Sequence, residues 1–231
     1  MDAARREKKE HGTLSFPFQI YPALDGSEAD DSDFIPYHWH PELEIITVDC
    51  GRVSLTIADR MYEGARGDVF FAASEELHEI RAAGRENQFR SFVFAADFLQ
   101  FARADETEFA LLEPLAEGRL RFATCLRSGE PGQSEVRTLL AQIVRTWQQQ
   151  APGCQLAVKA ALLGIVAVCA QYGRLEGRPV RPGADYRARQ LRETDLPVME
   201  VGFSVGFDNF SYFIKRFRSV YGVSPSHYRK G

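Results

Sequence analysis

The pattern of apolar and polar positions divides the chain into three parts, and the first part is rich in short strands. Between residues 16 and 94, short apolar or alternating runs are separated by turn-forming residues. The runs cover residues 34–40, 43–48, 53–57, 68–71 and 89–94, and the turns fall at Pro41, Cys50-Gly51, Ala58-Asp59 and residues 64–67. Many short strands at close spacing are typical of sandwiches and barrels. This part is therefore predicted to be a β-sandwich or a β-barrel.

The middle of the chain has helical spacing. Residues 95–99 are predicted to start a short helix, and residues 120–124 to return as a strand. Ser134 is then expected to cap one helix, and residues 155–172 form a second helix that is apolar on more than one face. Since a helix that is apolar all round needs cover, the two helices should pack against each other and the barrel.

The last forty residues predict two short helices joined by a tight turn, followed by a third. Pro197 suits a first helical turn, Gly206 supplies the break, and Asp208 or Asn209 caps the next helix. Gly222 ends that helix, and Ser224-Pro225 begins the last one. The middle helix has one continuous apolar stripe, made of Phe210, Phe213, Ile214, Phe217 and Tyr221.

The opposite face of this middle helix carries polar and cationic side chains. They are Tyr212, Lys215, Arg216 and Ser219, with Asn209 and Ser211 near the capped end. Arginine and lysine can donate to guanine, and asparagine can pair with adenine in the major groove. Nearby cations such as Arg218 and Arg229 would hold phosphates. The residues alone favour a DNA-reading face and an ordinary solvated face about equally.

The run from Thr194 to Lys230 resembles the second helix-turn-helix of the AraC family of transcription regulators. The matching residues are Val205-Gly206-Phe207, Phe213, Phe217, Tyr221-Gly222, Ser224-Pro225 and Tyr228-Arg229. Gly202 stands where the family more often has alanine, a change expected to lower helix stability slightly and to do nothing else.

The resemblance implies a ligand-responsive, sequence-specific DNA-binding regulator rather than an enzyme. It also implies a transcription activator that works with RNA polymerase and senses a small molecule such as a sugar. In AraC-type proteins the helices that match residues 131–173 commonly form the dimer contact, so a homodimer is expected.

Charge and composition agree with a cytoplasmic regulator. The net charge is −4, but residues 184–231 carry +3 and the remainder −7, as expected for a basic DNA reader on an acidic sensor. Residues 1–12 lack the apolar core of a signal peptide, and the longest apolar run, residues 160–170, is too short to cross a bilayer. The four cysteines have no metal-type spacing and are predicted to be reduced and mostly buried.

Candidate chemistry in the first part centres on three histidines and a carboxylate. His38 and His40 share a strand face, and Glu44 has the same parity, although Pro41 should interrupt the strand. The order His38-x-His40, Glu44, Gly51, Gly67-Asp68 and His78 resembles the cupin barrel, a jelly-roll fold in which these positions point inward. Residues 67–78 depart from the second cupin motif because they lack its usual proline and glycine, and the asparagine that tends to follow the histidine is also absent.

Two interpretations of these residues stay open. His38, Trp39, His40, Glu44 and His78 line an effector pocket without a cofactor, which we favour, or His38, His40, Glu44 and His78 hold a divalent metal. The metal interpretation supports an alternative function, a metal-dependent cupin oxygenase or isomerase with an appended helical domain.

The predicted organisation is α+β. Residues 1–130 form a cupin-like effector domain with an N-terminal arm, residues 131–173 the helical dimerisation segment, residues 174–185 a linker and residues 186–231 the helix-turn-helix. The first of the family's two helix-turn-helix units is not found. Either the protein reads DNA with one unit, or a segment between about Arg181 and Tyr186 is missing, which we favour.

Overall fold

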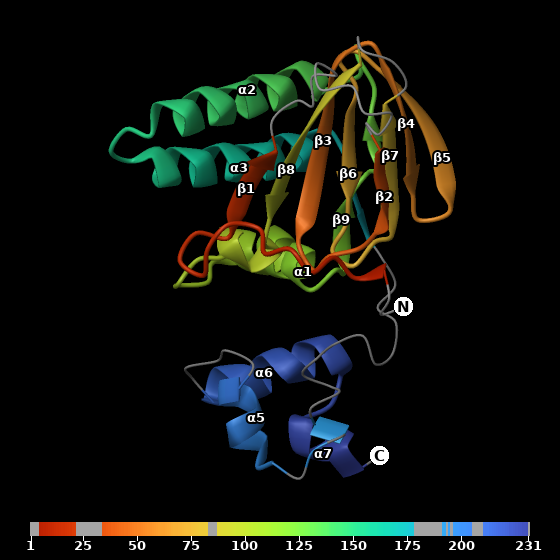
Figure 1. The fold of residues 1–231 in the computed structure, drawn as a ribbon. Coiled ribbons are helices and arrows are strands. Elements are labelled where there is room, and N and C mark those ends of the chain that lie inside the picture. Colours follow the sequence, from red (N-terminus) through yellow and green to blue (C-terminus); the bar gives the residue numbers. More distant parts are fainter. Residues whose placement is uncertain are drawn as a thin grey trace. The chain divides into compact units, whose positions relative to one another are not determined.

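The computed structural model describes residues 5–21, 34–82, 87–177, 191–192, 194, 196–204 and 210–230. The chain divides into two compact units, Met1–Arg178 and Pro179–Gly231. The first unit is a sandwich of β-sheets with helices on one side, and the second is helical (Figure 1).

Two facing antiparallel sheets form the body of the first unit. The larger sheet has the strand order β1-β8-β3-β6-β10, and the smaller has the order β2-β7-β4-β5. The strands are β1 (Phe18–Tyr21), β2 (Phe34–His38), β3 (Leu43–Cys50), β4 (Arg52–Ile57), β5 (Arg60–Ala65), β6 (Val69–Ala72), β7 (His78–Ala82), β8 (Gln88–Phe94) and β10 (Cys125–Leu126). The predicted jelly-roll-type barrel within an α+β chain is confirmed.

Strand β3 shows how the two faces of the larger sheet are used. Ile46 and Val48 pack into the interior between the sheets, whereas Ile45 belongs to a second core under the helices. All residues from Leu43 to Val48 are therefore buried. Burial on both faces explains why the apolar residues of this strand, Leu43, Ile45, Ile46 and Val48, do not alternate with polar ones.

The interior between the sheets changes from apolar to polar along the strands. One part is filled by Ile46, Val48, Val53, Leu55, Ile57, Phe70, Ile80 and Phe89. Glu44 lies two residues before Ile46 on β3 and has the same parity, and His78 lies two residues before Ile80 on β7. Since side chains alternate along a strand, the sheets carry these two polar groups into the interior beyond the apolar core.

Helices cover the outer face of the larger sheet. The 3₁₀ helix η2 (Ala96–Leu99), the π-helical turn η3 (Glu108–Leu112) and α1 (Glu113–Ala116) precede strand β9 (Leu120–Phe122). Helices α2 (Gln133–Gln149) and α3 (Cys154–Gln171) then lie side by side beyond β8 and β1 (Figure 1). Within the described residues, α3 is the one helix long and apolar enough to cross a membrane by length and composition. Seven of its residues are buried, as in a core helix.

Strands β1, β5, β7 and β10 were missed by the sequence prediction. Strand β5 is mostly exposed and has a weak apolar pattern, so residues 64–67 were wrongly taken as one turn. Gly64 lies inside β5, where a Cβ atom would stand 2.8 Å from the Phe70 ring. The glycine therefore makes room for a core aromatic, and the turn is confined to Arg66-Gly67.

Two further local predictions were wrong. Ser134 does not cap α2: its hydroxyl bonds the Glu135 carboxylate, and the helix begins at Gln133 after Gly132, whose φ is 87°. Residues 175–177, predicted as linker, form β11 (Leu175–Gly177), which pairs with β9 and places Leu175 opposite Phe122. Of the four free cysteines, Cys154 and Cys169 are buried, whereas Cys50 is exposed and Cys125 is intermediate.

The second unit contains α5 (Val198–Ser204), α6 (Phe210–Tyr221) and α7 (Pro225–Lys230). The predicted apolar stripe forms its core, with Phe213 and Phe217 buried against Leu191 and Val201. Gly222, with φ of 74°, ends α6, and the Ser224 hydroxyl accepts from the His227 amide at the start of α7. The predicted turn and cap at Val205 to Asn209 lie outside the described residues.

Gly202 has a larger role than the sequence prediction gave it. A Cβ atom at this position would stand 3.0 Å from Cδ1 and 3.2 Å from Cγ of Phe213. The glycine therefore allows α5 to approach α6 closely, in addition to its effect on helix propensity.

Candidate functional site

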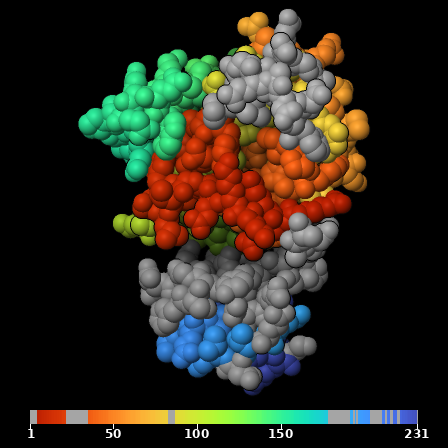
Figure 2. Space-filling view, viewed as in Figure 1, coloured from red at the N-terminus to blue at the C-terminus, as the bar shows by residue number. Residues whose placement is uncertain are grey.

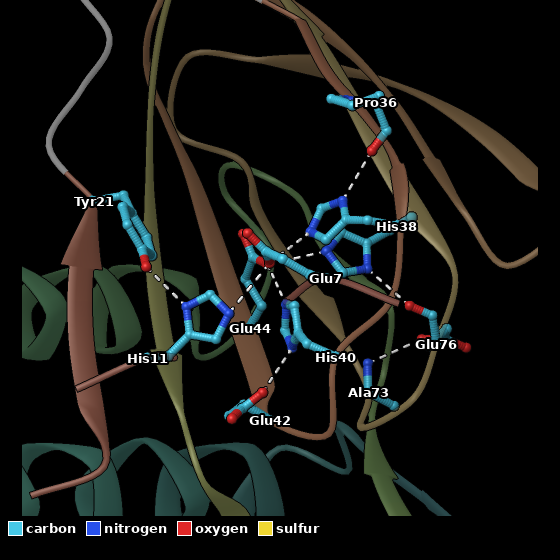
Figure 3. A network of polar contacts seen from close by, with 11 residues as sticks. Glu7, His11, Tyr21, Pro36, His38, His40, Glu42, Glu44, Ala73 and Glu76 are labelled. Atoms are coloured by element: carbon cyan, nitrogen blue, oxygen red, sulfur yellow. Dashed lines mark hydrogen bonds and ion pairs between the residues drawn. The ribbon is translucent and has the colours of Figure 1, made fainter. Parts of the chain in front are cut away.

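Four of the residues singled out in the sequence converge in the barrel interior. The ligand atoms of His38, His40, Glu44 and His78 all lie within 4.8 Å of one another (Figure 3). His38 ends β2, His40 lies in the connection to β3, Glu44 is near the start of β3, and His78 begins β7. Both sheets therefore contribute to the cluster, and all four residues except the half-buried His38 are buried.

The three imidazoles are oriented by acceptors on their outer sides. His78 Nδ1 donates to the carbonyl of Glu76 at 2.8 Å, and His38 Nδ1 to the carbonyl of Pro36 at 2.9 Å. His40 Nδ1 lies 3.4 Å from Oε2 of Glu42. With Nδ1 engaged in this way, Nε2 of each ring is the nitrogen available to the cluster.

Glu44 is the centre of the cluster. Its Oε2 lies 3.1 Å from His40 Nε2 and 3.0 Å from His78 Nε2. Burial by itself would raise the pKa of Glu44, but the hydrogen bonds from the two histidines hold that pKa well below its ordinary value. Glu44 is therefore a buried carboxylate held in its charged form.

The charge of Glu44 also favours the protonated form of His40. Burial opposes protonation of His40, but Glu42 and Glu44 together raise its pKa to about 9. The pKa of His38 is lowered, mainly by burial. His40 thus carries a proton at neutral pH in the absence of a bound cation, and an incoming metal ion would have to replace that proton.

The donor set fits a divalent metal ion. His78 has acceptors at both ring nitrogens, the Glu76 carbonyl and the Glu44 carboxylate. Its Nε2 must therefore either carry a second proton or give its lone pair to a cation. Three imidazole nitrogens and one carboxylate are ligands that zinc, iron, manganese or nickel can accept, and backbone carbonyls hold Nδ1 of His38 and of His78.

Sequence reasoning missed Glu7, His11 and Tyr21, which also reach the cluster. Glu7 Oε2 lies 3.2 Å from His11 Nε2 and 3.6 Å from His38 Nε2. His11 Nδ1 bonds the hydroxyl of Tyr21 at 2.8 Å. The available signal was the scarcity of histidine, since four of the five in the chain meet here. The N-terminal position of Glu7 and His11, outside any predicted strand, concealed it.

Trp39, predicted to line the pocket, is half-buried, and the guanidinium of Arg6 lies over its ring at 5.6 Å. Phe70 and Phe92 are fully buried in the two apolar cores.

The predicted DNA-contacting residues occupy α6 and its surroundings in the second unit. Ser211 and Arg218 are exposed on α6. Arg229 is instead engaged within the unit, because its Nε donates to the carbonyl of Leu191 at 3.0 Å. Asn209 and the side chains of Tyr212, Lys215 and Arg216 lie outside the part of the chain that the structure describes.

Each of the two units matches a known domain family. The AraC-like ligand binding domain matches residues 21–166, and a helix-turn-helix domain matches residues 186–231. An uncharacterized HTH-type transcriptional regulator of Bacillus subtilis, YdeC, is 21% identical, with 100% of this chain and 97% of that protein covered. That alignment extends over 287 positions, 56 more than the 231 residues of the chain, so the relative has residues without a counterpart here.

Similarity to solved structures is local. A mutant of Bacillus subtilis oxalate decarboxylase is 24% identical with a TM-score of 0.25, over 26% of this chain and 18% of that chain. A conserved protein of unknown function from Streptococcus pyogenes is 23% identical with a TM-score of 0.26, over 28% of this chain and 56% of that chain. It is the two domain matches that decide the family: the chain belongs to the AraC-like transcription regulators and joins a ligand-binding barrel to a helix-turn-helix domain.

Proposed function

We propose that this regulator detects its signal at the cluster of His38, His40, Glu44 and His78 and activates transcription in response. The supporting observation is the convergence of four ligand atoms within 4.8 Å in the interior of the ligand-binding domain. Such a group of charged and hydrogen-bonded side chains is costly to bury, and a bound ligand would compensate for that cost.

A divalent cation is the ligand class that suits the cluster best. Glu44 supplies an anionic oxygen, and each imidazole presents Nε2 toward the group. When bound, the ion would supply positive charge and Lewis acidity to an oxygen-bearing effector such as a sugar or an organic acid. The sensor would then respond to the ion itself or to an effector held with it.

The regulator would act as a cytoplasmic homodimer joined through α3. This helix is buried along one side, but Leu156 is 73% exposed and Ala160 and Ala167 are exposed. These residues, with the half-buried Leu163, recur at helical spacing and form a second apolar stripe. A partner copy would cover this stripe.

The second unit would read DNA through α6. Arg216, Lys215, Tyr212, Asn209 and Ser211 would face base edges, and Arg218 would hold phosphate. Effector binding would alter DNA affinity by favouring one arrangement of the sensor over another, so that RNA polymerase is recruited only in the bound state.

A metal-dependent enzyme of the oxygenase or isomerase class is the second candidate, favoured by the same four ligands. A catalytic metal requires an open position for substrate. Here His40, Glu44 and His78 are at most 4% exposed, and the Glu7 carboxylate lies next to His38. This enclosure favours a sensor of the ion itself over an enzyme that must admit a substrate.

A double substitution tests the regulatory function. The His38→Ala/His40→Ala variant should lose ligand-dependent transcription in a reporter assay while binding operator DNA with its basal affinity. The effector is first found by screening divalent ions, sugars and organic acids against wild-type protein. Unchanged induction in the double variant would exclude the cluster as the effector site. Steady turnover of a candidate substrate by metal-loaded wild-type protein would instead favour the enzyme.

A further inference from the structure

The N-terminal arm, defined as residues 5–16, is attached to the barrel next to the cluster. The amide of Glu7 donates to the carbonyl of Trp39 at 3.0 Å, and the amide of Trp39 donates to the carbonyl of Arg5 at 3.1 Å. These bonds extend the edge of the sheet just beyond β2. In Figure 2 the described part of the N-terminal segment, in red, spreads over one face of the barrel. The arm thus brings Glu7 to the residue that separates His38 from His40.

Glu7 and His11 repeat on the arm the chemistry found in the barrel. The Glu7 carboxylate lies between two imidazoles, 3.2 Å from His11 Nε2 and 3.6 Å from His38 Nε2. Glu44 lies between two imidazoles in the same way. Figure 3 shows both carboxylates directed toward the same group of rings.

His11 is built into this position as a ligand would be. Its side chain is 3% exposed, and its Nδ1 is held by the hydroxyl of Tyr21. Its Nε2 is buried without a hydrogen-bond partner and faces Glu7. The His11 ring also lies 4.9 Å from the ring of His40, centroid to centroid. A buried nitrogen that lacks a hydrogen bond is costly unless something binds it.

We propose that the arm is itself part of a metal site, in which Glu7, His11 and His40 coordinate a divalent cation beside the four-residue cluster. The ligand atoms of these three residues lie within 4.8 Å of one another. One carboxylate and two imidazoles are a ligand set that a borderline ion such as zinc accepts. The inference rests on the proposed role of the cluster as the sensing site, because the two ligand sets share His40.

This arrangement makes attachment of the arm depend on the ion. Phe16 fixes the end of the arm in the apolar core. The part before it is held by two backbone hydrogen bonds beside Trp39, by the His11–Tyr21 bond, and by cations that lie over aromatic rings. A cation bound by Glu7 and His11 on one side and His40 on the other would join arm and barrel through coordination bonds. The arm also contains four basic residues that trypsin recognises, Arg5, Arg6, Lys8 and Lys9. Their cleavage reports whether the arm is held.

The test combines zinc titration with limited trypsin digestion of the full-length protein. Wild-type protein is stripped with chelator, titrated with Zn²⁺, and digested with and without the ion, and the N-terminal cleavage is followed by intact mass. The variants are Glu7→Gln and His11→Gln, with Glu10→Gln as the matched control, since Glu10 is an exposed carboxylate on the same arm. Cobalt replaces zinc in a parallel series, because its absorption spectrum changes with the number of nitrogen ligands.

Zinc should slow cleavage in the arm of wild-type protein about tenfold or more. Glu7→Gln and His11→Gln should lose that protection and bind zinc about 10–100-fold more weakly, with an altered cobalt spectrum. Glu10→Gln should behave as wild type. Equal affinity, spectrum and protection in all four proteins would overturn the inference and leave the four-residue cluster as the site. If wild-type protein binds no divalent ion, the inference fails, while effector-dependent transcription still tests the regulatory function separately.

Discussion

Glu44 Oε2 lies 3.0 Å from Nε2 of His78, although 34 residues separate the two in the chain. The contact joins β3 of the larger sheet to β7 of the smaller sheet across the interior of the barrel. The packing of the two sheets therefore sets the spacing of the ligand atoms. A change in how the sheets pack would alter the site without changing any of its residues.

Glu44→Gln should abolish ion binding at the four-residue cluster and destabilise the ion-free protein. The amide cannot supply the charge that holds His40 and His78, and breaking a buried ion pair costs about 3–5 kcal/mol. Urea unfolding and zinc titration measure the two effects. Glu79→Gln is the matched control, because Glu79 is a buried carboxylate of the same sandwich that bonds Thr56 and Arg81 instead. Similar zinc affinities in the two variants would contradict the role assigned to Glu44.

The ion-free protein should lose stability as the pH rises above neutrality. The folded-state pKa of His40 is about 9, above its ordinary value of 6.5. The stabilisation that His40 provides is therefore complete below the unfolded-state pKa and is lost as the pH rises through the folded-state value. Glu44 has the opposite sign, since its lowered pKa provides stability above 4.5 that is lost at lower pH.

Thermal unfolding of chelator-treated protein between pH about 5 and about 10 tests this prediction. The melting temperature should be highest between the ordinary pKa values of Glu44 and His40 and should fall toward pH 10. His40→Gln should show a smaller fall over the alkaline range. A melting temperature that rises through this range in the wild-type protein would contradict the prediction.

Gly12→Ala should loosen the N-terminal arm and weaken zinc binding. Gly12 has a φ of 82°, and a Cβ atom there would stand 2.5 Å from the backbone of both Phe16 and Phe18. Gly129→Ala is the matched control, because Gly129 has a φ of 85° but open space around it. Both variants carry backbone strain of about 1–3 kcal/mol. The difference in zinc affinity between them therefore reports the crowding of the new Cβ atom by the backbone of Phe16 and Phe18. Trypsin digestion should detect a freed arm in Gly12→Ala alone.

Gly202→Leu should weaken DNA binding to all sequences alike. Even a Cβ atom would stand 3.0 Å from the Phe213 ring, and overpacking of this kind costs about 1–3 kcal/mol. The change alters the packing of α5 on α6 rather than any base contact. Met199→Leu, at an exposed position of the same helix, should leave affinity unchanged. A loss confined to particular operator sequences would argue against a packing effect.

Arg216→Ala and Arg218→Ala should separate base reading from phosphate binding. Arg216→Ala should lower sequence preference by about 1–3 kcal/mol at one base position. Arg218→Ala should weaken binding to all sequences and reduce the salt slope by about one. Arg229→Ala should instead destabilise the second unit, because Arg229 bonds Leu191 within it. If Arg216→Ala keeps both affinity and preference, α6 presents a different face to DNA.

Much of the second unit and the positions of several strands in the first follow from local patterns. The stripe from Phe210 to Tyr221 repeats every three or four residues, so it defines a helix face wherever the helix lies. Glycine at position 222 and serine at position 224 act on their own backbone neighbours, and both were predicted correctly. The grouping of His38, His40 and Glu44 does not follow from alternation along one strand, because His38 ends β2, His40 lies in the connection and Glu44 belongs to β3.

Contacts between segments that are distant in the chain could be identified only from the folded structure. Glu7 and His11 have no periodic signal, and they reach His38 and His40 because the backbone of the arm pairs with Trp39. The sequence predicts only that Gly202 weakens its helix, whereas in the structure this glycine lies against the ring of Phe213. Strand β5 escaped prediction because its edge position leaves it mostly exposed. In each case the role of the residue depends on a contact with a residue far away in the chain. The periodicity of the sequence does not show which distant residues will be in contact.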